Sequence, residues 1–190
     1  MKRITLFASG SGTNVENIYN HFKNNPEIII DSVYTNNPNA FVIERCKNLG
    51  IKCFIFNRDN FYNSQDLLNK LNSSEIDLIV LAGFLWLIPN YLTDSYANKI
   101  INIHPALLPK YGGKGMYGMN VHKAVKEHNE LKSGITIHFV NNEYDKGDII
   151  EQHEVDLLPT DSAEDIANKI HKLEYDFFPK AIEKILKLNS

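Results

Sequence analysis

The sequence has few cysteines, no long apolar segment and no large excess of charge of either sign. Its two cysteines, Cys46 and Cys53, are too few for a disulfide framework, and their spacing fits no common metal site. We therefore expect both thiols to be reduced core residues. No apolar run approaches the roughly 20 residues that a membrane-spanning helix needs, which excludes a transmembrane helix.

The charge balance and the first residues narrow the class of protein further. A net charge of −3 gives no basic surface for the phosphates of a nucleic acid. The apolar segment behind Met1 and Lys2 is short and runs into a Ser-Gly turn, which is not the pattern of a signal peptide. We expect a cytoplasmic protein, a monomer or weak homodimer, whose partners are small molecules and neither nucleic acid nor membrane.

The length and the order of the apolar segments indicate one domain of the α/β class. A hydrophobic content of 43% over 190 residues suits a single domain spanning residues 1–190. Alternating strand and helix patterns favour a doubly wound, mostly parallel, Rossmann-like sheet. The expected strands are 4–8, 28–34, 51–56, 77–82 and 98–103, and the expected helices are 15–22, 40–49 and 66–71.

The second half of the chain has a different pattern. Residues 135–140 and 149–155 read as a strand pair around a turn, which adds mixed or antiparallel strands to the sheet. Residues 163–186 form a long helical pattern that Pro179 is expected to kink or break. Residues 109–120 hold four glycines without apolar periodicity, so we expect a mobile loop there.

A carboxamide and an imidazole follow the strand expected at 98–103. Asn102 and His104 are two residues apart, so they point to one face of the strand, and Pro105 ends the pairing. Ligands of open α/β sheets bind at this end of the strands. An imidazole moves a proton near neutral pH, and a carboxamide N–H stabilises an oxyanion. The pair fits acyl transfer, although an isolated Asn-x-His also fits turn or capping residues.

A glycine-containing turn joins the first strand to the first helix. Gly12, Thr13 and Asn14 precede helical spacing, and a helix N-terminus offers unpaired N–H groups to a phosphate. The turn is not a dinucleotide fingerprint, because Val15 replaces its third glycine, and no lysine completes a P-loop. The alternative is an ordinary tight turn with a Thr or Asn cap.

Two more segments are candidates for the same site. Residues 82–89 follow a buried strand and supply bulky apolar side chains for a flat ligand, or else pack as a loop in the core. The acidic turn 143–148 offers a carboxylate that orients His104, or else is a solvated turn. His138 faces either the site or the core. The other histidines considered have no ligand spacing, so we expect no metal: His122, His128, His153 and His171.

These segments occur together in a known order. SGSGTN, LAGFLWLI, INIHPALLPKY and a late D-x-G turn resemble the phosphoribosylglycinamide formyltransferases, a folate-dependent family of purine synthesis, from about residue 3 to residue 180. The resemblance implies the formyltransferase fold and transfer of a formyl group from 10-formyltetrahydrofolate to the amine of phosphoribosylglycinamide.

The resemblance also implies roles for individual residues. It makes Asn102 an oxyanion donor, His104 the general acid, and Asp145 the group that raises the pKa of His104. Phosphoribosylglycinamide would be held by Gly12, Thr13, Asn14 and Glu174. The formyl-folate would be held by Leu85, Trp86, Leu87, Ile88 and Asn102.

Some positions depart from the family pattern. Trp86 stands where an arginine is common, and Ser64 falls near a place where a folate-contacting arginine occurs. The loop 110–120 is longer and richer in glycine, and we expect it to act as a lid. Two alternatives remain: a formyltransferase for another amine, such as a sugar nucleotide, and a non-catalytic Rossmann-type nucleotide-binding module.

Overall fold

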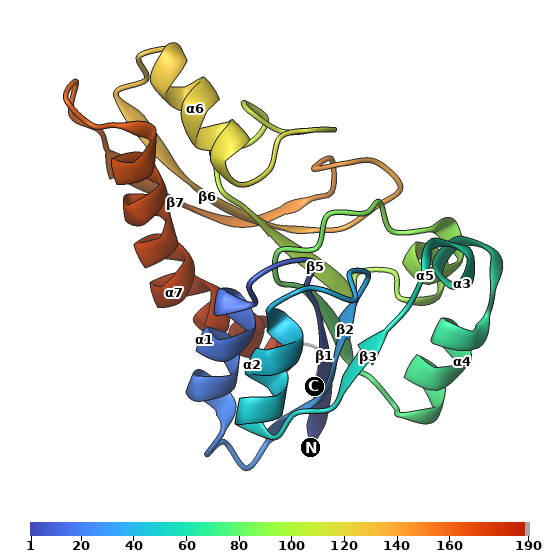
Figure 1. The fold of residues 1–190 in the computed structure, drawn as a ribbon. Coiled ribbons are helices and arrows are strands. Elements are labelled where there is room, and N and C mark those ends of the chain that lie inside the picture. The colour runs from blue at the N-terminus through green and yellow to red at the C-terminus, as the bar shows by residue number, and fades with distance from the viewer. Residues whose placement is uncertain (189–190) are drawn as a thin grey trace.

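Seven strands form one mixed sheet with helices on both faces (Figure 1). The computed structural model describes residues 1–188. The strand order is β3-β2-β1-β4-β5-β6-β7, parallel from β3 to β5 and antiparallel from β5 to β7. The strands are β1 Lys2–Phe7, β2 Ile28–Thr35, β3 Cys53–Ile55, β4 Leu78–Leu81, β5 Ile100–His104, β6 Lys132–Phe139 and β7 Ile149–Asp156. The helices are α1 Thr13–Phe22, α2 Val42–Leu49, α3 Arg58–Asn63, α4 Asp66–Ser73, α5 Asn90–Ser95, α6 Met119–Glu127 and α7 Ala163–Leu188.

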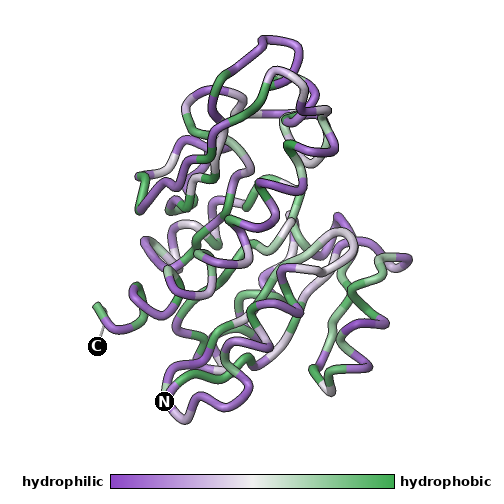
Figure 2. Tube along the Cα trace, turned by 90° about the vertical axis from the view of Figure 1, so that its left-hand side faces the viewer, coloured by the Kyte–Doolittle hydropathy of each residue, from purple (hydrophilic) through white to green (hydrophobic). Residues whose placement is uncertain are grey.

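An apolar core lies on each face of the sheet. Helices α1, α2, α6 and α7 build one core, which contains Val15, and α3, α4 and α5 build the other, which contains Phe61. Because side chains alternate along a strand, Val80 enters the first core while Ile79 and Leu81 enter the second. In Figure 2 apolar and polar segments alternate along the helices, as expected when one side of a helix faces a sheet. The doubly wound α/β class predicted from the sequence is therefore confirmed.

The strand order places a switch point between β1 and β4. The chain moves outward from β1 to β2 and β3, and then returns to β4 and β5 on the other side of β1. Loops that leave the carboxyl ends of β1 and β4 therefore diverge and leave a crevice between them. The strand pair β6 and β7 extends the sheet beyond β5, as predicted for the second half, and pairs His138 with Asn102.

Three helices were not predicted, and the expected mobile loop is shorter than proposed. Helices α3 and α5 have only six residues each, which is too short for a helical period to appear in the sequence. Helix α6 begins at Met119, directly after Gly118, so residues 119 and 120 belong to a helix and not to the loop. Both cysteines are free thiols, with Cys46 buried and Cys53 partly buried.

Pro179 does not break the long C-terminal helix. Of the two outcomes expected from the sequence, a kink or a break, the break is therefore wrong. Helix α7 runs through Pro179 to Leu188. A proline has no N–H for the carbonyl four residues earlier, which here belongs to Tyr175. The side chain of Asn17 in α1 replaces that donor, because its Nδ2 donates to the Tyr175 carbonyl at 3.1 Å. A neighbouring helix thus satisfies the carbonyl group that Pro179 leaves free.

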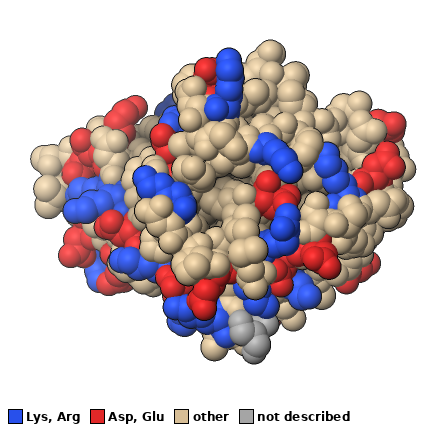
Figure 3. Space-filling view, turned by 90° about the horizontal axis from the view of Figure 1, so that it is seen from below, with Lys and Arg blue, Asp and Glu red and all other residues tan. Residues whose placement is uncertain are grey.

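The surface carries interspersed charges on the face drawn in Figure 3. Lysine and arginine side chains alternate with aspartate and glutamate there, without an extended area of one sign. Among residues 1–188, no helix combines the length and apolar character needed to span a bilayer.

The contact between Asn17 and Tyr175 gives a test of how α7 tolerates its proline. We expect Asn17→Ala to lower the free energy of unfolding by about 1 kcal/mol, because the carbonyl loses the donor that replaces the missing helical N–H. In a Pro179→Ala background the loss should be smaller, since the alanine introduced there supplies an N–H to the same carbonyl. Urea unfolding of the two single variants and the double variant measures this coupling, with Asn20→Ala on the exposed side of α1 as the control. Strictly additive effects would contradict the explanation.

Candidate active site

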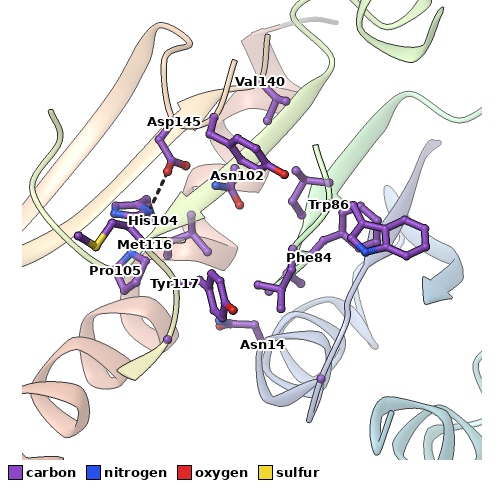
Figure 4. Close-up of a pocket in the computed structure, with 18 of the residues that line it drawn as sticks. Asn14, Phe84, Trp86, Asn102, His104, Pro105, Met116, Tyr117, Val140 and Asp145 are labelled. Atoms are coloured by element: carbon purple, nitrogen blue, oxygen red, sulfur yellow. Dashed lines mark ion pairs between the residues drawn. The ribbon is translucent and has the colours of Figure 1, made fainter. Parts of the chain in front are cut away.

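A cavity of about 640 Å³ opens at the carboxyl ends of β1, β4 and β5, on the switch point of the sheet. The residues predicted to bind or catalyse come from five separate parts of the chain, and all of them line this cavity (Figure 4). They are Gly12, Thr13, Asn14, Leu85, Trp86, Leu87, Ile88, Asn102, His104, Asp145 and Glu174.

The N-terminus of α1 forms one end of the cavity. Gly12 is the N-cap residue in the left-handed conformation, with a φ of 73°, and no side chain caps this helix. A Cβ at Gly12 would lie 2.4 Å from Val42 Cγ2, so both the backbone angle and the close packing require glycine. The uncapped N–H groups and the helix dipole together suit an anion.

Strand β5 supplies the pair at the centre of the cavity. Asn102 is half-buried and His104 is 3% exposed, and both line the cavity from one face of the strand, as predicted. The Nε2 of His104 lies 2.8 Å from the carbonyl oxygen of Tyr111, to which it donates. The Nδ1 of His104 lies 3.5 Å from Asp145 Oδ2. Both ring nitrogens of His104 therefore face acceptors, an arrangement that favours the protonated ring.

Asp145 links the turn between β6 and β7 to three other parts of the site. Its side chain is 11% exposed, and its Oδ2 accepts a hydrogen bond of 2.8 Å from the Gly113 N–H. Its Oδ1 lies 3.7 Å from His138 Nε2. The backbone of Asp145 is itself left-handed, with a φ of 56°, which turns the carboxylate back toward β5.

The electrostatic environment of His104 differs from the expectation in one respect. Burial lowers the pKa of His104 and is the largest influence, while Asp145 and the Tyr111 carbonyl raise it. Asp145 thus acts in the expected direction, but the pKa of His104 stays below its ordinary value because desolvation dominates. Burial alone would raise the pKa of Asp145, but His138, His104 and the Gly113 N–H together hold it below its usual range.

His138 belongs to the site, which sequence reasoning left open. It is 2% exposed, and its Nδ1 donates to its neighbour's carbonyl, Phe139 O, at 2.7 Å. Its Nε2 is then free to accept from Asn102 Nδ2 at 3.2 Å. This contact fixes the orientation of the Asn102 amide. Strand alternation in β6 was visible in the sequence, but the register that pairs His138 with Asn102 was not.

The opposite side of the cavity is apolar and aromatic. Phe84 packs against the rings of Phe7, Phe61 and Phe56. The ring of Trp86 packs against Phe56, Phe61 and Phe84, and Figure 4 shows Trp86 beside Phe84. The guanidinium of Arg58 lies 5.6 Å from the centroid of the Trp86 ring. Ser64 does not line the cavity, and its hydroxyl instead accepts from the Asp66 N–H at the start of α4.

The glycine-rich loop after β5 covers part of the cavity. Gly113 to Gly118 all line it, and Tyr117 points across it toward Asn14 in Figure 4. Its first part is fixed by the contacts of Tyr111 with His104 and of Gly113 with Asp145. Within residues 1–188, no three metal-ligating side chains are grouped so as to hold a metal ion.

The fold and the site define a formyl transferase, and the family model with that description matches residues 2–182. The phosphoribosylglycinamide formyltransferase of Bacillus subtilis is 36% identical over 195 residues, which cover 100% of this chain and 97% of that protein. The chloroplastic phosphoribosylglycinamide formyltransferase of Arabidopsis thaliana is 34% identical over 192 residues, which cover 97% of this chain and 65% of that protein. The crystal structure of phosphoribosylglycinamide formyltransferase from Bacillus halodurans superimposes with a TM-score of 0.87 at 32% identity, covering 100% of this chain and 97% of that one. The chain belongs to the phosphoribosylglycinamide formyltransferase family.

The contact between Asp145 and His104 predicts a change in pH dependence. Asp145→Asn removes a negative charge that raises the pKa of His104, so that pKa falls further. A reaction that needs protonated His104 slows as pH rises through this pKa. We therefore expect the fall in kcat/KM to move to lower pH in the variant. Near neutral pH, lowering this pKa by about one reduces kcat/KM about tenfold, because the protonated fraction falls by that factor.

Rate profiles of the wild type and both variants, Asp145→Asn and Asp148→Asn, measure this effect. Asp148 is an exposed carboxylate in the same turn and serves as the matched control. A profile for Asp145→Asn that is merely scaled down, with unchanged apparent pKa values, would mean that Asp145 acts only through structure.

Proposed function

We propose that this chain transfers the formyl group of 10-formyltetrahydrofolate to the amine of 5′-phosphoribosylglycinamide, and that residues 1–190 act as one formyltransferase domain. The observation that carries the proposal is that the predicted binding and catalytic residues line one cavity of about 640 Å³. An anion-binding helix end, an apolar slot and a carboxamide-imidazole pair are thereby brought within reach of two substrates at once.

The nucleotide substrate fits the side formed by α1 and α7. The backbone N–H groups of Gly12, Thr13 and Asn14 make no hydrogen bond within the described protein, so they remain available for a phosphate. Glu174 lines the same side at 7% exposure and supplies a carboxylate for an amine. Phosphate and amine are the two charged groups of phosphoribosylglycinamide.

The formyl-folate fits the apolar side. The backbone N–H groups of Trp86 and Ile88 make no hydrogen bond within residues 1–188, and they lie on the wall of the cavity. A flat heterocycle placed between Phe84 and Val140 would meet these donors. The apolar lining of this wall suits a pterin ring. The formyl-folate that carries this ring supplies the activated one-carbon group.

The residues of β5 would then carry out the transfer. Asn102 Nδ2 uses one N–H in its contact with His138, and its second N–H is free to donate to the formyl oxygen, where negative charge develops. The substrate amine would attack the formyl carbon and form the new C–N bond. As the bond between that carbon and the folate nitrogen breaks, protonated His104 would give its proton to the departing nitrogen and regain one from the amine that attacked. The 3.5 Å contact between His104 and Asp145 is longer than a charged hydrogen bond and has room to tighten when both substrates are bound.

Removal of either polar group on β5 tests the proposed chemistry. We expect Asn102→Ala to lower kcat by about 100- to 1000-fold, because one oxyanion donor is lost. We expect His104→Ala to lower it by at least about 100-fold, because the proton donor is lost. Formyl transfer from 10-formyltetrahydrofolate to phosphoribosylglycinamide is the assay, with circular dichroism to verify the fold.

Near-wild-type turnover in either variant would remove that residue from the mechanism. A thermal-shift panel of phosphoribosylglycinamide, a sugar nucleotide amine, a folate and NAD tests the substrate independently of turnover. We expect phosphoribosylglycinamide and the folate to raise the Tm. Stabilisation by NAD alone would favour a nucleotide-binding module instead.

The glycine-rich loop predicts a second measurable property. We propose that residues 113–118 form a lid, because they line the cavity and their glycines make an ordered free state entropically unfavourable. Hydrogen exchange of these amides should slow when phosphoribosylglycinamide and an unreactive folate analogue are both bound, whereas exchange in α4 should not change. A variant shortened within this segment should hydrolyse more formyl donor for each transfer. Equal exchange in both states would show that the loop is no lid.

A further inference from the structure

Two buried polar atoms on the wall of the cavity have no hydrogen-bond partner within the described residues. They are Asn14 Oδ1 and His122 Nδ1. Asn14 is 8% exposed and His122 is 2% exposed, and both residues line the cavity. Buried polar groups are nearly always paired in folded proteins, because an unpaired one loses its hydrogen bonds to water without replacement. Each of these atoms therefore destabilises the substrate-free protein.

Both residues belong to one cluster around Glu174, built from α1, α6 and α7. Asn14 Nδ2 donates to Glu174 Oε2 at 3.1 Å, and His171 Nδ1 lies 3.1 Å from the same oxygen. The ring of His122 lies 6.4 Å from the ring of His171, measured between centroids. His122 is also near enough to Glu174 and His104 for their charges to act on it.

The hydrogen-bond chemistry of the cluster is one-sided. A carboxylate only accepts, so its contact with Asn14 fixes the amide with Nδ2 toward Glu174 and Oδ1 away from it. Glu174 Oε1 takes part in no hydrogen bond within the described residues. Burial and the neighbouring His171 lower the pKa of His122 to about 4, so its ring is neutral near pH 7. We assign its one proton to Nε2, which makes the unpaired Nδ1 an acceptor. Unpaired acceptors therefore gather at this end of the cavity.

We propose that His122 is a further substrate-binding residue, which with Asn14 and Glu174 forms a set of buried acceptors for the N–H groups of the amine substrate. The inference rests on the proposed function, since the glycinamide group carries an amine and an amide N–H. His122 stands on α6, the helix that directly follows the glycine-rich loop, and its buried ring already lines the cavity. These acceptors would bind the N–H groups of the substrate, while its phosphate would bind at the N-terminus of α1.

The variant His122→Phe separates binding from packing, because it keeps an aromatic ring and removes both nitrogens. We expect the KM for phosphoribosylglycinamide to rise about tenfold, since one lost hydrogen bond of ordinary strength corresponds to about one tenfold step in affinity. The KM for the formyl donor should stay within about twofold. The Tm of the substrate-free protein should rise by about 2–4 °C, because an unpaired buried atom is removed.

Two companions sharpen the test. His122→Asn places an amide near the position of Nδ1 and should restore most of the affinity for phosphoribosylglycinamide. His21→Phe is the matched control, since His21 lies at the far end of α1 and does not line the cavity. Titration with ribose 5-phosphate, which has no N–H group, should give the same Kd for wild type and His122→Phe, whereas the Kd for phosphoribosylglycinamide should rise.

The outcomes distinguish this inference from the proposed function. An unchanged KM, or a lower Tm with an unchanged KM, would make His122 a structural residue and overturn the inference. An equal loss of affinity for ribose 5-phosphate would also overturn it, because His122 would then act on the phosphoribosyl part. If wild-type protein binds phosphoribosylglycinamide but transfers no formyl group to it, the proposed function fails, while the Kd comparison still decides the role of His122.

Discussion

The carboxylate of Asp145 joins the antiparallel end of the sheet to its parallel part. It accepts from the Gly113 N–H at 2.8 Å and lies 3.5 Å from His104 and 3.7 Å from His138. The start of the glycine-rich loop, the end of β5 and the turn after β6 are therefore held around one negative charge. Because this charge is largely removed from water, it raises the pKa of His104, and the burial that strengthens this effect also opposes protonation of His104.

The position of this carboxylate depends on the topology. Strands β1, β4 and β5 bring the anion-binding turn, the apolar slot and the Asn-His pair to one edge of the sheet, as expected at a switch point. A purely parallel sheet that ended at β5 would contain only these three parts of the site. The antiparallel pair β6 and β7 adds His138 opposite Asn102 and returns the acidic turn to the same edge. The helix α7 then packs against α1 and brings Glu174 to Asn14.

Local sequence was sufficient for the parts of the site that lie within one strand or one turn. Asn102 and His104 share a face of β5 because they are two residues apart. The helical spacing that follows Gly12 was also recognisable in the sequence. Contacts between distant segments were not predictable in this way. The pairing of His138 with Asn102 depends on strand register, and the donation from Asn17 to the Tyr175 carbonyl, which lets α7 continue past Pro179, depends on helix packing. His171 and Glu174 are three residues apart on one helix, a spacing in the sequence that could have indicated their contact.

Several residues that line the cavity or contact its lining are in states that do not favour the free protein. Tyr111 and Asp145 both have left-handed backbones with a φ of 56°, a conformation that costs non-glycine residues about 1–2 kcal/mol each. Asn14 Oδ1 and His122 Nδ1 are buried without partners among the described residues. The strained residues are those whose carbonyl and carboxylate hold His104, and the unpaired atoms lie around Glu174. Among residues 1–188, left-handed residues and unpaired buried atoms also occur away from the cavity, for example at Asn98 and at Arg3 Nε. The unpaired atoms around Glu174 differ from these because they line the cavity, where a substrate could supply the missing hydrogen bonds.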